Sequence, residues 1–168
     1  MKIFNLLLVA ILITCGTTRV AFAEEDESDW ALVGATDQAV IFFDKPTLQK
    51  AGENKYFVGL RYELTKAGKR EYIKLLSSVT KNAEEVKEIQ TMLAPLTYII
   101  HLVELDVQSR TMIVKTVIHF DDEDNAFYGY DEENNVVEVI EPRTVNEEIL
   151  NAVVNYANSV SAHNPATP

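Results

Sequence analysis

Cysteine is almost absent from this chain of 168 residues. The one cysteine, Cys15, lies in the apolar N-terminal stretch, and the chain has only six glycines, five prolines and three histidines. A framework of disulfides within the chain is therefore excluded. The sequence also lacks a phosphate-binding glycine loop, a dinucleotide-binding fingerprint and the Gly-x-Ser-x-Gly sequence of serine hydrolases. Because no catalytic motif is present, we expect a protein that is not an enzyme and that carries no cofactor.

Basic residues are scarce as well. The chain has 15 lysines and arginines against 26 aspartates and glutamates, which gives a formal net charge of -11 at pH 7. A surface of this sign repels nucleic acids and anionic lipid headgroups. The composition therefore argues against a nucleic-acid partner, and it favours a basic partner or none.

Long hydrophobic runs are missing apart from the first. Lys2 is followed by the apolar run 3–13, by Ala21-Phe22-Ala23 and then by acidic residues. This order is typical of an export signal with a small-x-small cleavage site. The run is shorter than the roughly 20 residues that a membrane span requires. We therefore expect a signal peptide at 1–23, an acidic segment at 24–29, and an exported protein without a transmembrane span, in the periplasm or at the cell surface.

Cys15 leaves one alternative open. The order Leu12-Ile13-Thr14-Cys15-Gly16 resembles a bacterial lipobox, in which the cysteine is lipidated and becomes the mature N-terminus. Threonine before the cysteine departs from the usual glycine, alanine or serine, and cleavage after Ala23 removes the cysteine altogether. We therefore favour cleavage after Ala23 over lipid anchoring at Cys15.

Two β-rich runs around a polar break predict the centre of the fold. The runs 98–107 and 112–120 flank Gln108-Ser109-Arg110 and indicate an antiparallel hairpin of long strands. An isolated hairpin is only marginally stable in water, so these strands need partners. Shorter strand patterns that supply partners occur at 30–34, 39–44, 55–64 and 136–140.

Two amphipathic helices are predicted as well. The first, 82–93, has Asn82 as its cap, and the second, 144–160, begins with Thr144 and Glu147 in the order of a capping box. Between strand and helix, 65–70 is expected to be a hairpin turn, and 71–79 a strand whose spacing also permits a helix.

These elements predict one α+β domain over residues 30–160. We expect a single antiparallel β-sheet of about six to seven strands, packed by the C-terminal amphipathic helix. The short helix near 82–93 adds to this sheet, and the tail 161–168 is expected to be disordered.

The acidic segment 121–133 is the only stretch that invites a metal. Its oxygen-bearing residues follow the calcium-loop spacing of an EF-hand in part. Alanine replaces the glycine of the sharp turn, and a strand precedes the segment where an EF-hand has a helix. We therefore favour a solvated loop without a metal, in which three aromatic residues pack back on the sheet and are candidates for protein binding. The metal candidates are Asp121, Glu123, Asn125 and Glu132, and the aromatic candidates are Phe127, Tyr128 and Tyr130.

Two histidines and two carboxylates are the remaining candidates. His101 and His119 approach each other across the hairpin if its register places them on one face, and they are then candidates to bind haem or a metal. A packed histidine is the plainer interpretation. Glu104 and Asp106 share one face of their strand, where we expect them to pair with basic side chains rather than act in acid–base catalysis.

The order of short motifs resembles the surface-adhesin protein E family of small exported bacterial proteins. The matching pieces lie between Trp30 and Ala157 and are Trp30-Ala31-Leu32-Val33-Gly34, Val40-Ile41-Phe42-Phe43-Asp44, Glu104-Leu105-Asp106-Val107 with Arg110, and Ile140-Glu141-Pro142 before a terminal helix containing Leu150. The resemblance implies an antiparallel sheet packed by a C-terminal helix, and attachment to host matrix proteins. Relatives often carry a cysteine where this chain has Val107, and a second one near Tyr156 or Ala157.

We therefore expect a non-enzymatic, adhesin-like exported protein that binds another protein, such as a host matrix or envelope protein. The binding surface is expected on the exposed face of the sheet or in the loop after Phe120. A homodimer stays open. The alternative is a periplasmic carrier of haem or metal that uses His101, His119 and nearby aromatic residues.

Overall fold

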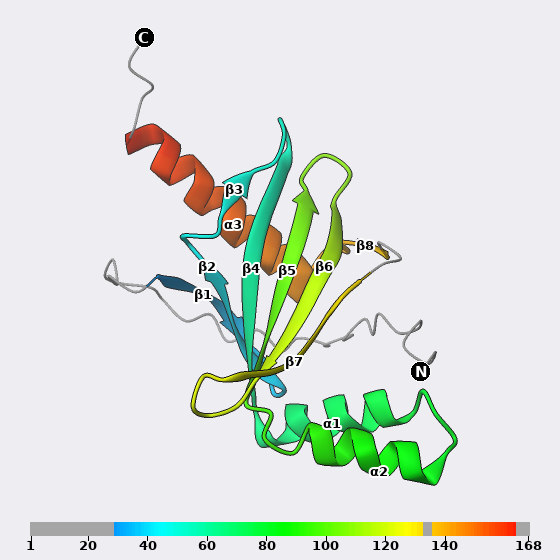
Figure 1. Cartoon of the computed structure of the whole chain (residues 1–168). Coiled ribbons are helices and arrows are strands. Elements are labelled where there is room, and N and C mark those ends of the chain that lie inside the picture. The colour runs from blue at the N-terminus through cyan, green and yellow to red at the C-terminus, as the bar shows by residue number, and fades with distance from the viewer. Residues whose placement is uncertain (1–28, 133–135, 164–168) are drawn as a thin grey trace.

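The computed structural model describes residues 29–132 and 136–163, which form an open antiparallel sheet with helices (Figure 1). The sheet order is β1-β2-β4-β5-β6-β7, with β3 paired to β4 and β8 paired to β6. The predicted signal peptide, Cys15 and most of the acidic N-terminal segment lie outside the described residues. The elements are β1 (Trp30–Ala35), β2 (Ala39–Asp44), β3 (Gln49–Lys50), β4 (Lys55–Leu64), α1 (Lys66–Ser77), α2 (Ala83–Met92), β5 (Tyr98–Asp106), β6 (Thr111–Phe120), β7 (Ala126–Asp131), β8 (Val137–Val139) and α3 (Val145–His163).

The predicted hairpin is confirmed as β5 and β6. Its register places Tyr98 opposite Phe120 and Asp106 opposite Thr111, with one irregularity between Leu102 and Val103. The Asp106 carboxylate accepts hydrogen bonds from the backbone N–H groups of Gln108 and Ser109, which closes the turn. The predicted α+β class, with one antiparallel sheet and a C-terminal helix, is therefore correct.

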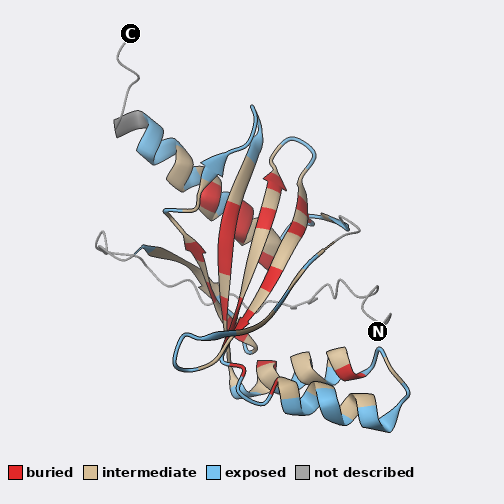
Figure 2. Cartoon of the chain, viewed as in Figure 1, coloured by how far each residue is buried: buried red, intermediate tan, exposed pale blue. Residues whose placement is uncertain are grey.

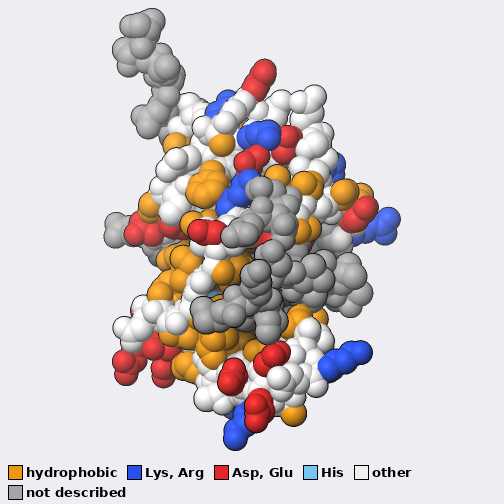
Figure 3. Space-filling view, turned by 45° about the vertical axis from the view of Figure 1, so that its right-hand side comes forward, with side chains coloured by type: hydrophobic (Ala, Val, Ile, Leu, Met, Phe, Trp, Pro, Cys, Tyr) orange, Lys and Arg blue, Asp and Glu red, His pale blue; other side chains and the backbone are white. Residues whose placement is uncertain are grey.

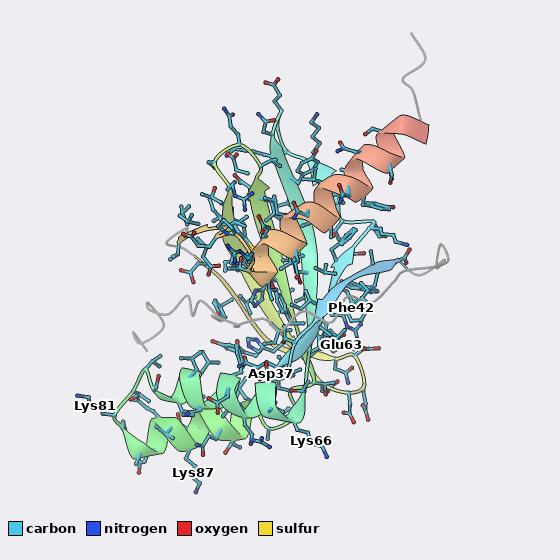
Figure 4. All side chains as sticks on the ribbon, turned by 180° about the vertical axis from the view of Figure 1, so that it is seen from behind. Asp37, Phe42, Glu63, Lys66, Lys81 and Lys87 are labelled. Carbon is cyan, nitrogen blue, oxygen red and sulfur yellow. The ribbon has the colours of Figure 1, made fainter. Side chains whose placement is uncertain are left out.

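Helix α3 lies across one side of the sheet, as the view from behind shows (Figure 4). Along β2 the residues Ala39, Ile41 and Phe43 are buried, while those between them are half-buried. The buried set packs with Ile149 and Val153 of α3, both 0% exposed, in one hydrophobic core. Figure 2 shows the buried residues concentrated on the central strands and on α3. We call this side of the sheet the helix face and the other side the open face.

Helix α3 starts at a cap that is tied to the hairpin turn. The N–H of Glu147 donates to the hydroxyl of Thr144, as the predicted capping box requires, although at 3.4 Å. The Glu147 side chain reaches back to the N–H of Arg143 at 2.7 Å rather than to that of Thr144. It also pairs with Arg110, whose Nη2 lies 2.6 Å away. These contacts fix the start of α3 over the β5–β6 turn.

The segment 65–79 differs from the predicted turn and strand. It forms helix α1, which Thr65 caps by accepting a hydrogen bond from the N–H of Gly68. The expected solvated hairpin tip is therefore the first turn of a helix, and Lys69 donates to the carbonyl of Ala94 at 2.6 Å. The α1–α2 pair sits below the sheet, with Lys66, Lys81 and Lys87 projecting outward (Figure 4).

The acidic segment is also more ordered than predicted. Residues 121–125 form a loop, but Ala126–Asp131 is strand β7, paired with β6. At the C-terminus α3 extends to His163, so the first residues of the expected tail are helical. Residues 164–168 lie outside the described residues.

Candidate functional site

The open face of the sheet is crossed by one aligned row of side chains. The register places Phe42 opposite Arg61, Arg61 opposite Ile100, and Ile100 opposite Ile118. Leu32 extends the row into β1, and Gly129 ends it in β7. Every side chain of the row is half-buried rather than buried. Among the described residues no helix lies over this face (Figure 1).

The open face carries a stack of four side chains from β1, β4, β5 and β6, centred on Arg61, which we call the Arg61 stack. The Arg61 guanidinium lies 3.9 Å from the centroid of the Tyr98 ring and 5.7 Å from that of Trp30. Tyr98 stacks on Phe120 with ring centroids 4.7 Å apart and planes 6° from parallel. Arginine over an aromatic face is a stabilising cation–π arrangement. The stack therefore joins four strands through their side chains, and it leaves Tyr98 only 5% exposed.

The acidic loop 121–125 borders this stack. The Tyr98 hydroxyl donates to the carboxylate of Asp124 at 3.0 Å. Burial and this hydrogen bond raise the pKa of Tyr98 to about 12. The Asp121 carboxylate accepts from the N–H groups of Glu123 and Asn125, and these bonds lower its pKa. The loop is thus held in one shape, with Asp122 and Glu123 exposed.

Hydrophobic and acidic side chains gather next to each other on the surface. In Figure 3 hydrophobic side chains gather to the left of the centre of the view, and acidic side chains lie at their lower left.

The predicted carboxylate pair also lies on the open face. Lys55 contacts Glu104 at 2.9 Å and Asp106 at 3.8 Å, and Lys115 contacts Glu104 at 3.8 Å. Backbone N–H donors from the turn, together with Lys55, lower the pKa of Asp106. Both carboxylates therefore have basic partners, as expected.

His119 is enclosed on the helix face. Its Nδ1 lies 3.3 Å from the carbonyl oxygen of Tyr128, and its Nε2 lies 2.8 Å from the hydroxyl of Tyr72 in α1. Because a carbonyl only accepts, the proton belongs on Nδ1, and Nε2 accepts from Tyr72. Burial lowers the pKa of His119 to about 4, so the ring is neutral at pH 7.

His101 reaches the same face as His119. It pairs with Val117 while Ile99 pairs with His119, which makes the two histidines diagonal neighbours. The His101 ring lies 4.8 Å from that of Tyr62. Burial, followed by the neighbouring His119, lowers its pKa to about 4. The register therefore places both histidines on one face of the hairpin. This is the condition under which the sequence predicts that their rings approach each other.

The candidate metal ligands do not converge. Asp121, Glu123 and Asn125 are in the loop, but the extended strand β7 separates them from Glu132, whose N–H donates to the carbonyl of Lys115. In the described part of the chain no three or more His, Cys, Asp or Glu side chains are grouped closely enough to hold a metal ion.

The three candidate aromatic residues belong to β7 and surround His119. Their ring centroids lie 6.2 Å (Phe127), 5.3 Å (Tyr128) and 6.4 Å (Tyr130) from its ring.

The sequence did not predict the Arg61 stack. The one signal for this stack is that an aromatic residue begins or ends the strand patterns that supply it, as Tyr98 and Phe120 do in β5 and β6.

The comparisons with known proteins add no relative. No protein-family model, no curated protein and no solved structure matches the chain. No helix among the described residues combines the length and the apolar character that crossing a membrane requires.

Proposed function

We propose that this chain is a non-enzymatic, exported, adhesin-like protein that binds another protein on the open face of its sheet. The observation that carries the proposal is the row of half-buried Leu32, Phe42, Ile100 and Ile118 on a face that no helix of residues 29–132 and 136–163 covers. Apolar patches of this kind on soluble proteins mark interaction sites. The adjacent Arg61 stack adds half-buried arginine and tryptophan, two of the residue types that dominate binding energy at interfaces.

The binding test uses two substitutions on the row and two elsewhere. Phe42→Thr and Ile118→Thr place β-branched threonine, which suits a strand, at both positions but remove apolar area from the open face. Val79→Thr and Val160→Thr make similar changes at exposed positions, 38% and 44% exposed, away from the row. Binding to immobilised extracellular-matrix proteins is measured by biolayer interferometry, after circular dichroism shows that each variant is folded.

We expect the row variants to lose about tenfold or more in affinity and the control variants to keep it. Equal binding by both sets of variants, or no binding of the native protein to any matrix protein, would contradict the proposal.

Attachment of an adhesin also depends on where the mature chain begins. Mass spectrometry of the mature N-terminus separates Glu24, which follows cleavage after Ala23, from a lipidated Cys15. Recovery in the outer-membrane or surface fraction supports adhesion. A free periplasmic or secreted species that does not bind matrix proteins argues against it.

A small-ligand carrier is the second candidate, because two neutral histidines share the helix face with Tyr62 and Tyr72. His119 would have to release both Tyr72 and the Tyr128 carbonyl to bind haem or a metal. Titration with haem and with divalent metals, followed by absorbance and calorimetry, tests this role. The absence of any change would remove it.

A further inference from the structure

The row on the open face has the dimensions of a short peptide. It crosses six strands, β1, β2, β4, β5, β6 and β7, at one level. With neighbouring strands about 4.8 Å apart, the row is about 24 Å long, which matches about seven residues of extended chain. Its one charged member, Arg61, already contacts Tyr98 and pairs with Glu63 at 2.9 Å. The row therefore offers apolar contacts rather than a free cation.

Carboxylates border the row on both sides. On the side of Tyr98 and Phe120 lie Glu63 and Asp124, with the exposed Asp122 and Glu123 beyond them. On the other side Asp131 accepts a hydrogen bond from the Thr116 hydroxyl at 2.8 Å. Lys55 and Lys115 on this face are within 4 Å of Glu104. The rim of the open face is thus acidic.

The charge decides which protein fits this face. A second copy of the chain also has a net charge of -11, so two open faces would bring acidic rims together. Like charges across an interface are unfavourable, and complementary charges speed association and select partners. We infer that the open face binds a basic protein segment, in which apolar side chains that contact the row alternate with lysine or arginine side chains that reach the acidic rim. This inference rests on the proposed function and names the chemistry of its partner.

Trp30 provides a reporter at this site. It is the only tryptophan of the chain, and it contacts Arg61 on the open face. The probes are three synthetic peptides of about nine residues. One alternates leucine with lysine, the second alternates leucine with glutamate, and the third alternates serine with lysine. We expect the leucine–lysine peptide to change Trp30 fluorescence in a saturable way. It should bind at least tenfold more tightly than either of the other two peptides. Its affinity should fall when salt is raised from about 0.15 M to about 0.5 M.

Neutralising variants locate the charge effect. Asp122→Asn with Glu123→Gln removes two exposed charges beside the Arg61 stack, and Glu53→Gln with Glu88→Gln removes two exposed charges elsewhere. We expect the first pair to weaken the leucine–lysine peptide about three- to tenfold, and the second pair to leave its affinity unchanged.

Three results would overturn the inference. The first is that the leucine–glutamate peptide binds as tightly as the leucine–lysine peptide, and the second is that the serine–lysine peptide does so. The third is that a neutral oligosaccharide changes Trp30 fluorescence in a saturable way while none of the peptides does. These results can be distinguished from results that contradict the proposed binding face itself. If Phe42→Thr and Ile118→Thr abolish matrix binding while charge has no effect, the binding face stands and only its preference for a basic partner is wrong.

Discussion

The hydroxyl of Tyr72 lies 2.8 Å from Nε2 of His119 and joins helix α1 to the end of strand β6. Both groups are removed from water, since His119 is 0% exposed, and burial raises the pKa of Tyr72. The hydrogen bond therefore satisfies a buried acceptor, and it holds the α1–α2 pair on the sheet.

Replacing Tyr72 by phenylalanine tests this bond. Tyr72→Phe leaves Nε2 of His119 buried without its donor, which should lower the free energy of unfolding by about 1–3 kcal/mol. Tyr156→Phe removes a hydroxyl from another half-buried tyrosine, one that packs on Phe43, and should change it by less than about 0.5 kcal/mol. Urea denaturation measures both, and equal stability of the two variants would contradict the assigned role of Tyr72.

The lowered histidine pKa values predict a loss of stability in mild acid. The pKa of His119 is about 4 in the folded protein against 6.5 for an ordinary histidine. Between these values the unfolded chain binds a proton that the folded chain does not, so the free energy of unfolding falls as pH drops from about 6.5 towards 4. For His119 the loss between pH 7 and pH 5 should be about 2 kcal/mol.

His119→Gln provides the control for this pH dependence. Glutamine does not titrate, so the variant should be less stable at pH 7 but show a flatter profile between pH 6.5 and 5. Asp121 and Glu147 have pKa values below the ordinary 3.8 and 4.5 of these side chains. Their protonation therefore destabilises the fold only at a lower pH than that of His119. Parallel urea profiles for the native protein and the variant would refute the titration of His119.

Gly68 lies where α1 touches the β1–β2 turn. A β-carbon at Gly68 would lie 2.0 Å from the backbone oxygen of Gln38, whereas one at Gly52 would have no neighbour closer than 3.7 Å. Backbone atoms move only with their strand, so Gly68→Ala should lower the free energy of unfolding by about 3 kcal/mol. Gly52→Ala should stay within about 1 kcal/mol of the native protein. Thermal unfolding measures both, and similar melting temperatures would contradict this contact.

Glu147 holds the start of α3 by its cap and by Arg110. Glu147→Ala removes the acceptor for the Arg143 N–H and the partner of Arg110, and should lower the free energy of unfolding measurably. Asn151→Ala, at an exposed position of the same helix, should be nearly neutral. Chemical denaturation distinguishes them, and a neutral Glu147→Ala would show that the cap contributes little.

Local sequence patterns predicted those elements whose residues carry their own signal. The β5–β6 hairpin follows from two long β-rich runs around a polar turn, and the α3 start from Thr144 and Glu147. Helix α1 was not predicted, because the spacing of its apolar residues fits both a strand and a helix. Gly68 and the nearby lysines also resemble the residues of a turn. Gly68 is needed for a close approach to Gln38, a tertiary contact that no local pattern reveals.

The candidate site was predictable only in outline. The exposed face of the sheet was an expected location, but the Arg61 stack depends on register between strands that are distant in sequence. Strand β7 was concealed by acidic neighbours and by Gly129, although a glycine suits that position because a β-carbon there would lie 3.2 Å from the Val117 oxygen. Phe127, Tyr128 and Tyr130 consequently surround His119 from a strand, whereas the sequence predicted that they pack on the sheet from a loop.

The long excursion between β4 and β5 has a kinetic consequence. These strands are neighbours in the sheet, yet residues 65–97 lie between Leu64 and Tyr98, whereas β5 and β6 meet across a short turn. Closing a longer loop carries more entropy loss, so the β5–β6 hairpin should form early in folding and β4 should join later. Gly68→Ala should then act mainly on the unfolding arm of a chevron plot, while a substitution of Val103 should slow refolding. The α1–α2 pair would thereby set how long the folded sheet persists rather than how fast it is reached.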